Sequence, residues 1–382
     1  MISTPLAAFE NPSAVGSSLP HLISGDDGRL HLSWVTMEGD TAVFQHAAWN
    51  ENRWTKTEQI ARGTDWFVNW ADYPMFTINK AGNRLAHYLA KSSEGTYSYD
   101  VHLTASDDED SWLPAVIPHN DQTPTEHGFV TMLPDGAGSF TVAWLDGRRT
   151  AEEGPMTLRS AVVQADLQVS EHVELDDRVC DCCQTGGAMT ENGPVFVYRN
   201  RSEVEWRDIF IVRKVDGQWT NPQVVYEDRW EIAGCPVNGP RISALGNEMV
   251  VAWYTAANGR PMVKAVFSSD GGATFSDPVI LDNGQPLGRV DVAIIGPGKA
   301  AVSWLTGTGN DTATIKYRLI QPSDGQLLVE QEKDIVVAET SAARASGFPQ
   351  MSFHNNHLYF AWTEVENDVK RIRMAKAAVD IK

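Results

Sequence analysis

Apolar segments that end in an aromatic residue recur along the chain at nearly even spacing. The aromatic residues are Trp34, Tyr88, Trp144, Tyr198, Trp253, Trp304 and Trp362, which stand 51 to 58 residues apart. A turn rich in Gly, Asn or Asp precedes each segment, and another apolar segment precedes that turn. A third and usually a fourth apolar segment follow each aromatic residue, and no stretch shows helical periodicity of useful length. The pattern predicts four antiparallel strands repeated seven times.

Such a repeat predicts an all-β fold, a seven-bladed β-propeller of four-stranded antiparallel blades that occupies residues 1–382 as a single domain. The last repeat supplies only three clear strands, which end near RIRMAKAAV. The N-terminal segment TPLAAF precedes the first repeat and is expected to provide the missing outer strand. The two ends of the chain would then close the ring together. A six-bladed ring is the alternative.

Charge argues against several classes of partner. The chain has 31 Lys and Arg against 50 Asp and Glu, a formal net charge of −19. Nucleic acid and acidic membrane surfaces would repel such a protein, and no apolar run is long enough to span a bilayer. The N-terminus lacks the features of a signal peptide. We expect a periplasmic or secreted protein whose signal has been removed, although four cysteines leave the redox compartment open.

Strand order sorts the polar residues onto one face of the predicted propeller. Connections between repeats, and those between the second and third strands, emerge together on this face, where propellers usually bind ligands. They carry Trp66, Asn69, Asp72, His127, Asp146, Arg148, Arg149, Arg199, Arg201, Arg207, Asp208, Asn238, Arg289 and Asp291. Ligand binding is one interpretation of this set. Arg–Asp pairs that brace neighbouring blades are the other.

Three of the four cysteines lie within the segment VCDCCQTGG, as Cys180, Cys182 and Cys183. Cys235 follows about one repeat later, so all four thiols can gather beside one another at the predicted mouth. Thiolates favour copper(I) or zinc, and His127 from the preceding repeat could complete a metal site. The preferred ion is copper, with zinc as the alternative. Disulfides are a second interpretation, either from Cys180 or Cys182 to Cys235 or between Cys182 and Cys183, and buried free thiols are a third.

The segment SSDGGATF fits the Asp-box pattern through Ser268, Asp270, Gly272, Thr274 and Phe275. On this motif and the repeat, the chain resembles the sialidase-like superfamily of Asp-box (BNR repeat) propellers, and a bacterial subgroup that carries CDCCQT. The resemblance implies that the Asp-box is a structural turn on the face away from the mouth. It also implies a substrate carboxylate held by arginines, with an Asp as acid or base.

On that resemblance the candidate catalytic residues are Asp72, Arg148, Arg201, Arg207 and Arg289. The candidate ligand-binding residues are Trp66, Asn69, Arg199, Asn238 and Asp291, and Trp70, Trp206 and Trp230 could also stack on sugars. Sialidases have six blades and an Arg-Ile-Pro motif, which this chain lacks. Tyr198 occupies the position of a core Trp, so we expect it to pack rather than act as a nucleophile.

Three functions remain open. The leading one is an exported propeller with a metal at Cys180, Cys182, Cys183 and Cys235, which as an enzyme would be a metal-dependent redox enzyme. The second is a carbohydrate-active protein, either a sialidase-type hydrolase or a lectin. The third is a protein-interaction scaffold. The acidic segment SDDEDSW could hold calcium, with a solvated turn as the alternative.

Overall fold

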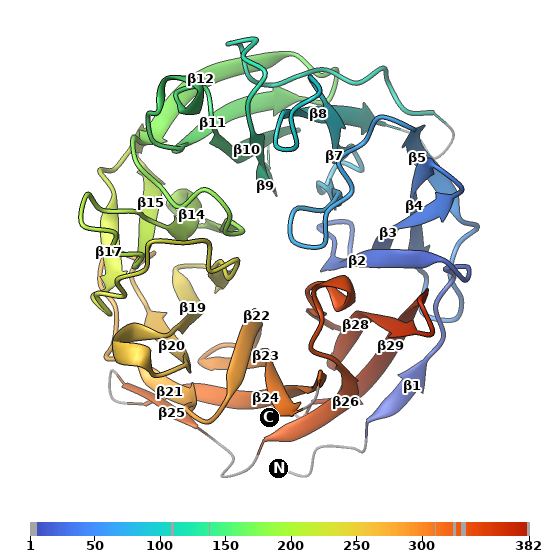
Figure 1. Cartoon of the computed structure of the whole chain (residues 1–382). Helices are drawn as coiled ribbons and strands as arrows, with labels where there is room; N and C mark the ends of the chain where they lie inside the picture. The colour runs from blue at the N-terminus through green and yellow to red at the C-terminus, as the bar shows by residue number, and fades with distance from the viewer. Residues whose placement is uncertain are drawn as a thin grey trace.

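Seven antiparallel sheets stand around a central axis in the computed structural model (Figure 1). The structure describes residues 6–107, 111–136, 138–309, 311–323, 326–329 and 334–379. Helical structure in these residues is limited to three short 3₁₀ turns, η1 (Thr150–Glu152), η2 (Ala257–Gly259) and η3 (Arg344–Ser346). The predicted seven-bladed all-β propeller is confirmed, and the six-bladed alternative is wrong. None of the helical turns described is long or apolar enough to cross a bilayer.

Blades 1 to 3 follow one another along the chain, with the first strand of each nearest the axis. Blade 1 consists of β2 (Ser17–Ser24), β3 (Leu30–Glu38), β4 (Thr41–Trp49) and β5 (Glu58–Gly63). Blade 2 consists of β6 (Met75–Ile78), β7 (Arg84–Lys91) and β8 (Tyr99–Ser106), and a single bridge from Leu103 to Val116 takes the place of an outer strand. Blade 3 consists of β9 (His127–Pro134), β10 (Ser139–Asp146), β11 (Thr157–Gln164) and β12 (Val169–Asp176).

Blades 4 to 6 repeat this order, with the outer strand split in two of them. Blade 4 consists of β13 (Gly186–Thr190), β14 (Gly193–Arg199), β15 (Ile209–Val215), β16 (Gln218–Trp219) and β17 (Gln223–Tyr226). Blade 5 consists of β18 (Arg241–Leu245), β19 (Glu248–Thr255), β20 (Met262–Ser268) and β21 (Val279–Asp282). Blade 6 consists of β22 (Pro286–Gly296), β23 (Lys299–Gly309), β24 (Thr312–Ser323), β25 (Gln326–Val329) and β26 (Ile335–Ser341).

Blade 7 joins the two ends of the chain. Its inner strands are β27 (Gln350–His354), β28 (His357–Glu366) and β29 (Val369–Ala378), and its outermost strand is β1 (Ala7–Phe9). Ala7 pairs with Lys376 and Phe9 with Met374, and Figure 1 shows β1 at the outer edge of this blade. The predicted closure by the N-terminal strand is confirmed. Because β1 and β29 come from opposite ends of the chain, this pairing joins the two ends within one blade and so stabilises the ring.

The recurring aromatic residues fill the spaces between blades. Trp144, Trp253 and Trp304 are at most 1% exposed, and each would add about 2–3 kcal/mol of burial free energy. Their indole N–H groups donate to carboxylates, at 2.8 Å for Trp144, 2.7 Å for Trp253 and 2.8 Å for Trp304. Tyr198 is fully buried in the same way and donates to Asp176 at 2.6 Å. Tyr198 is therefore a packing residue, as the sequence indicated.

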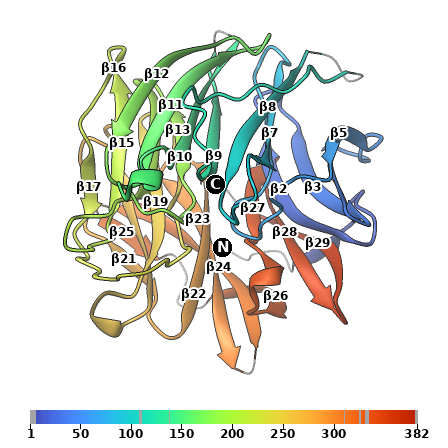
Figure 2. The same ribbon diagram turned by 45° about the horizontal axis from the view of Figure 1, so that its top comes forward.

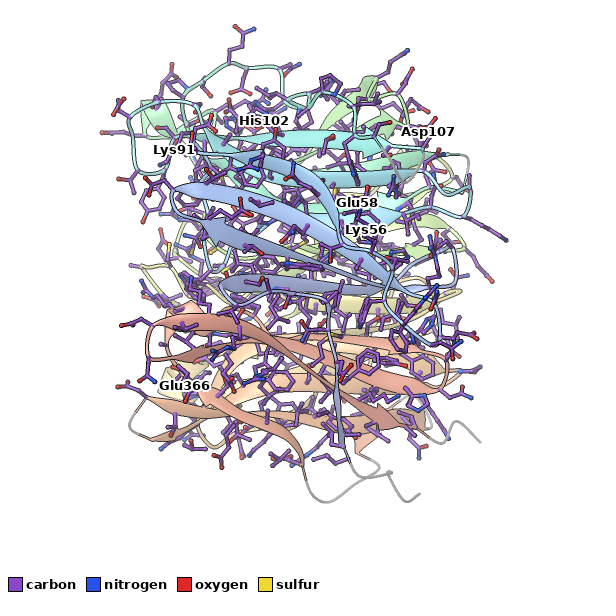
Figure 3. The ribbon with its side chains drawn as sticks, turned by 90° about the vertical axis from the view of Figure 1, so that its right-hand side faces the viewer. Lys56, Glu58, Lys91, His102, Asp107 and Glu366 are labelled. Atoms are coloured by element: carbon purple, nitrogen blue, oxygen red, sulfur yellow. The ribbon has the colours of Figure 1, made fainter. Side chains whose placement is uncertain are left out.

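The two faces of the ring are distinct in the side view of Figure 3. Lys91 and Glu366 end the second strands of blades 2 and 7, and both lie at one end of the molecule. Glu58 and Asp107, at the start of β5 and just after β8, lie at the other end. The ends of the second strands therefore define one face, which we call the mouth face.

The Asp-box forms the turn between β20 and β21, on the face opposite the mouth. Asp270 accepts the backbone N–H of Thr274 at 2.9 Å and its hydroxyl at 2.6 Å, while Ser268 accepts the N–H of Gly272 at 2.9 Å. Gly271 and Gly272 have φ values of +68° and +82°, which only glycine adopts without strain. Gly271 also donates to the turn between β18 and β19. The motif is structural, as its resemblance implied.

Candidate functional site

Hydrogen bonds across the axis link blades that are far apart in the ring. The Tyr73 hydroxyl, before β6, accepts from Arg241 of blade 5 and from Gln350 of blade 7, both at 2.9 Å. Gln184, before β13, donates to a backbone carbonyl beside β6 at 2.7 Å and accepts the N–H of Gly239 at 3.1 Å. Behind these braces lies a channel of about 660 Å³ lined by the first strands. The braces hold the loops of the mouth face in fixed positions.

Three thiols converge in the loop between β12 and β13. The Sγ atoms of Cys180, Cys182 and Cys183 all lie within 4.8 Å of one another, and those of Cys180 and Cys183 are 3.4 Å apart. Cys235, in the loop between β17 and β18, is close enough to Cys182 for the two thiols to affect each other's pKa. All four are free, and we call them the thiol cluster. Cys180 and Cys183 are buried, Cys182 is half-buried and Cys235 is exposed, so the cluster opens to solvent at one side.

Electrostatics favour a thiolate at the buried end of the thiol cluster. Hydrogen bonds with Cys182 and Cys183 lower the pKa of the Cys180 thiol, burial opposes them, and the Arg207 guanidinium lowers the pKa further. Arg207 donates to the Cys180 sulfur at 3.0 Å. The pKa values of Cys182 and Cys183 are raised, since their thiol protons are shared with the neighbouring sulfur and burial disfavours further negative charge. These opposite shifts favour a thiolate at Cys180 over one at Cys182 or Cys183.

The arginines around the thiol cluster are already paired within the chain. Arg201 lies between Asp181, at 3.2 Å, and Glu205, at 2.8 Å, and Arg207 also contacts Glu205 at 2.7 Å. Arg199 is buried and donates to the backbone carbonyls of Asn238 at 2.8 Å and Tyr254 at 2.7 Å. These residues support the thiol loop.

The other two candidate arginines lie in different blades. Arg148 contacts Asp146 at 2.6 Å in blade 3. Arg289 is buried beside blade 7, donates to the Gly347 carbonyl at 2.8 Å and lies over the Trp70 ring at 5.0 Å. The four arginines proposed from the resemblance to sialidases are therefore spread over several blades. Each is paired with other groups of the chain, so the four guanidinium groups do not form one site that could bind a carboxylate.

The remaining candidate ligand-binding residues also contact the protein itself. Trp66 stacks on Tyr88 with ring centroids 4.2 Å apart, and Asn69 accepts a backbone N–H at 2.8 Å. Asn238 accepts the N–H of Arg289 at 2.7 Å, and Asp291 accepts the N–H of Met351 at 2.7 Å. Trp230 is buried beneath Arg199, whereas Trp206 is 38% exposed.

Asp72 belongs to a buried acid pair that the sequence did not reveal. The Tyr99 hydroxyl donates to Glu126 at 2.6 Å and lies 3.2 Å from Asp72. Burial raises the pKa of Asp72 to about 8, although the N–H of Phe129 bonds its carboxylate. Burial also raises the pKa of Glu126 to about 7, helped by the charges of Asp181 and Cys180. One hydroxyl proton cannot satisfy two carboxylates, so the pair retains a proton near neutral pH.

His127 lies apart from the thiols. Its ring stacks on His119 with centroids 3.8 Å apart, among Asp100, Asp121 and Asp146. The sequence offered one signal for this group, the nine-residue stretch HNDQTPTEH, which holds two histidines and two acidic residues and ends at His127, the first residue of β9. Part of the acidic segment proposed for calcium, residues 108–110, lies outside the described residues.

Comparison with known proteins gives matches only among solved structures. No family model matches the sequence, and no curated protein matches it. A protein of unknown function from Dyadobacter fermentans is 12% identical, with 99% of each chain covered and a TM-score of 0.56. A PL25 ulvan lyase bound to -[GlcA(1-4)Rha3S]- is 11% identical, with 95% of this chain and 93% of that chain covered and a TM-score of 0.56.

An α-L-arabinanase from Penicillium chrysogenum, complexed with arabinobiose, is 15% identical, with 99% of each chain covered and a TM-score of 0.50. At such identities the likeness shows the fold alone. Together with the Asp-box turn, these structures support the sialidase-like propeller fold that the sequence indicated. The subgroup with the Cys-Asp-Cys-Cys segment stays a prediction.

Proposed function

We propose that the thiol cluster binds a soft metal ion, with copper(I) as the preferred ion. The observation that carries the proposal is the convergence of three sulfur atoms within 4.8 Å of one another on one short loop. Copper(I) favours thiolate ligands, and three sulfurs at this separation suit an ion held between them. The guanidinium of Arg207 favours ionisation of Cys180 before any ion arrives.

Zinc is the alternative ion, and Cys235 distinguishes the two. Structural zinc usually takes four ligands, so it would need Cys235 to move in and complete the set. Copper(I) can be held by the other three thiolates, with Cys235 as a point of entry from solvent. The exposure of Cys235 beside the half-buried Cys182 therefore favours an ion that is delivered or exchanged.

Anaerobic purification without chelators tests this proposal. We expect nearly one copper per chain by elemental mass spectrometry and four free thiols after denaturation. Copper(I) titration against a competing chelator should show an affinity loss of more than about 100-fold for Cys182→Ser. We expect a smaller loss for Cys235→Ser. All four cysteines lie in the cluster, so the control is Asp181→Asn, which removes a nearby charge and keeps every thiol.

Absence of bound metal, with two or four thiols missing from the count, would instead make the cluster a disulfide. Unchanged copper affinity in Cys182→Ser would also overturn the proposal. We further propose that the protein works in the periplasm or outside the cell. Fractionation of cells that express the native gene tests this location, and recovery of the protein in the cytoplasmic fraction contradicts it.

The acid pair favours a second candidate function, binding or cleavage of a carbohydrate. Asp72 and Glu126 share the Tyr99 hydroxyl, and a carboxyl that titrates near pH 7 suits general acid–base chemistry. The ulvan lyase and the arabinanase that share the fold were solved with sugars bound. Calorimetry against neutral and uronate-containing oligosaccharides tests this candidate. Heat of binding that Glu126→Gln abolishes and Cys182→Ser leaves intact would favour it, whereas no heat with any sugar would leave an interaction scaffold as the alternative to metal binding.

A further inference from the structure

A second group of potential ligands lies between blades 2 and 3, apart from the thiol cluster. Strand β8 of blade 2 faces β9 of blade 3 there (Figure 2), and Tyr99 of β8 forms an isolated bridge with Glu126, the residue just before β9. Asp100 lies on β8, His119 in the connection that follows it, and His127 at the start of β9. We call these three residues the histidine cluster. Their ligand atoms lie within 4.8 Å of one another.

Three polar atoms in the histidine cluster have no hydrogen-bond partner among the described residues. They are Asp100 Oδ1, His119 Nε2 and His127 Nδ1, and all three are buried. The Asp100 oxygen lies 3.5 Å from each of the two nitrogens. The side chains of His119 and His127 are 2% and 0% exposed. Buried polar atoms are nearly always bonded, so three such atoms that face one another indicate a missing partner.

The outer sides of both rings are held by a single carboxylate. His119 Nδ1 lies 3.0 Å from one oxygen of Asp121, and His127 Nε2 lies 3.2 Å from the other. A histidine ligand almost always bonds a carboxylate or carbonyl through its second nitrogen, which fixes the ring and its tautomer. Asp121 therefore orients both rings so that their free nitrogens face Asp100.

The charges around the histidine cluster also favour a bound cation. Arg148 contacts Asp146 at 2.6 Å and Asp121 at 3.3 Å, and Arg159 lies 3.9 Å from Asp146, so both guanidinium groups face carboxylates other than Asp100. Asp100 has no arginine or lysine among its ion pairs in the described part of the chain. A divalent ion between Asp100 and the two imidazoles would balance the remaining negative charge.

We propose that Asp100, His119 and His127 form a second metal site, which takes a first-row divalent cation such as zinc. Two imidazole nitrogens and one carboxylate oxygen are ligands that such ions accept, with water in the remaining positions. The two rings are parallel within 5°, so binding would tilt them toward the ion. The site differs from the thiol cluster in its ligands and in its blade, and it stands whether or not the thiols bind copper.

Zinc calorimetry on the chelator-treated protein tests the proposal. The double variant Cys182→Ser/Cys235→Ser disables the thiol cluster, so that remaining binding reports the histidine cluster alone. In this background we expect one equivalent of zinc. His119→Gln and Asp100→Asn should weaken binding by more than about 100-fold, and Asp121→Asn by about 10- to 100-fold.

His172→Gln is the matched control, because His172 is exposed on β12 and lies outside the cluster. It should bind zinc like the background. Asp100→Asn keeps the size of the side chain, and its thermal unfolding without metal will show that a loss of binding is not a loss of fold. No zinc binding in the background, or undiminished binding in both His119→Gln and Asp100→Asn, would overturn the proposal.

Discussion

The thiol cluster and the histidine cluster occupy the same face of the ring but are built differently. The thiol cluster takes three members from four consecutive positions of one loop, and its Cys235 is exposed. The histidine cluster takes its members from β8, the following connection and β9, and both of its imidazoles are buried. A soft site open to solvent suits exchange of an ion, whereas a sealed site with fixed rings suits retention.

Their electrostatic surroundings also have opposite sign. Arg207 donates to Cys180, so a cation stabilises negative charge in the thiol cluster. His127 lies among Asp100, Asp121 and Asp146, so anions stabilise positive charge in the histidine cluster. The acid pair lies between them, and Glu126 interacts with His127 on one side and with Cys180 on the other.

Asp72→Asn should have the largest effect on the free energy of unfolding, because it removes a carboxylate from the crowded negative charge beside the histidine cluster. The pKa of Asp72 is raised from 3.8 to about 8 in the folded chain, so the folded protein binds this proton more tightly than the unfolded chain does. Protonated Asp72 therefore makes its full contribution to the free energy of unfolding below pH 4. This contribution is lost as the pH rises to 8, at about 1.4 kcal/mol per pH unit.

Asparagine cannot ionise, yet it can still accept from Phe129 and donate to Tyr99. Urea unfolding from pH 4 to pH 8 should therefore show a falling free energy of unfolding for the native chain and a flatter profile for Asp72→Asn. At pH 8 the variant should be the more stable protein by several kcal/mol. Parallel profiles would show that Asp72 ionises normally in the folded chain.

Gly239→Ala should have the next largest effect on the free energy of unfolding, because Gly239 packs against the residue that follows the thiol loop. A Cβ atom on Gly239 would lie 1.9 Å from the backbone oxygen of Gln184, the residue that follows Cys183. Backbone cannot move aside as a side chain can, so we expect a loss of about 3 kcal/mol in urea unfolding. Copper(I) affinity should fall as well, since the thiol loop must shift.

Gly128→Ala is the corresponding change beside the histidine cluster. Its Cβ atom would lie 2.0 Å from a side-chain oxygen of Asp72 and 2.9 Å from the Tyr99 ring; side chains can shift more than backbone, so we expect a smaller loss of about 1–2 kcal/mol and no change in copper affinity. Gly296→Ala is the control, because nothing lies within 4 Å of its Cβ position. Equal stabilities of all three variants would contradict these close contacts.

Arg207→Gln should have a smaller effect, which is a change in the copper(I) affinity of the thiol cluster. The guanidinium lowers the pKa of Cys180, so its removal should raise that pKa and reduce the thiolate fraction. We expect copper(I) affinity to fall about 10-fold at pH 6, and less at pH 9, where thiols ionise more readily. Arg207→Lys keeps the charge and is the control. An equal loss at both pH values would assign Arg207 a purely structural role.

Sequence and structure agree where the determinants are local or repeated. Seven aromatic positions at even spacing predict seven blades, because each blade must fill the same space against its neighbour. The Asp-box predicts its own turn, since Asp270 bonds only residues within four positions. Cys180, Cys182 and Cys183 are neighbours in sequence, so their proximity needs little from the fold.

The sequence could not predict contacts that the fold creates between distant segments. Asp100 and His119 are separated by a connection whose path no pattern reveals, so the histidine cluster was missed. The candidate arginines do lie in the positions that strand order assigned. Their carboxylate and carbonyl partners, such as Glu205 for Arg201 and Gly347 for Arg289, depend on packing that the pattern does not contain.

Glu126→Gln should have the smallest effect on metal affinity, and the sign of the change should differ between the thiol cluster and the histidine cluster. Above pH 7 Glu126 is ionised, so it repels a thiolate at Cys180 and attracts a cation in the histidine cluster. Removal of this charge should raise copper(I) affinity by about 3-fold at pH 8. It should lower zinc affinity by about 3-fold, because the negative charge of Glu126 attracts a divalent ion nearby. At pH 6, where Glu126 is largely protonated, both changes should disappear. Changes of the same sign at both clusters would show that the substitution acts through structure rather than charge.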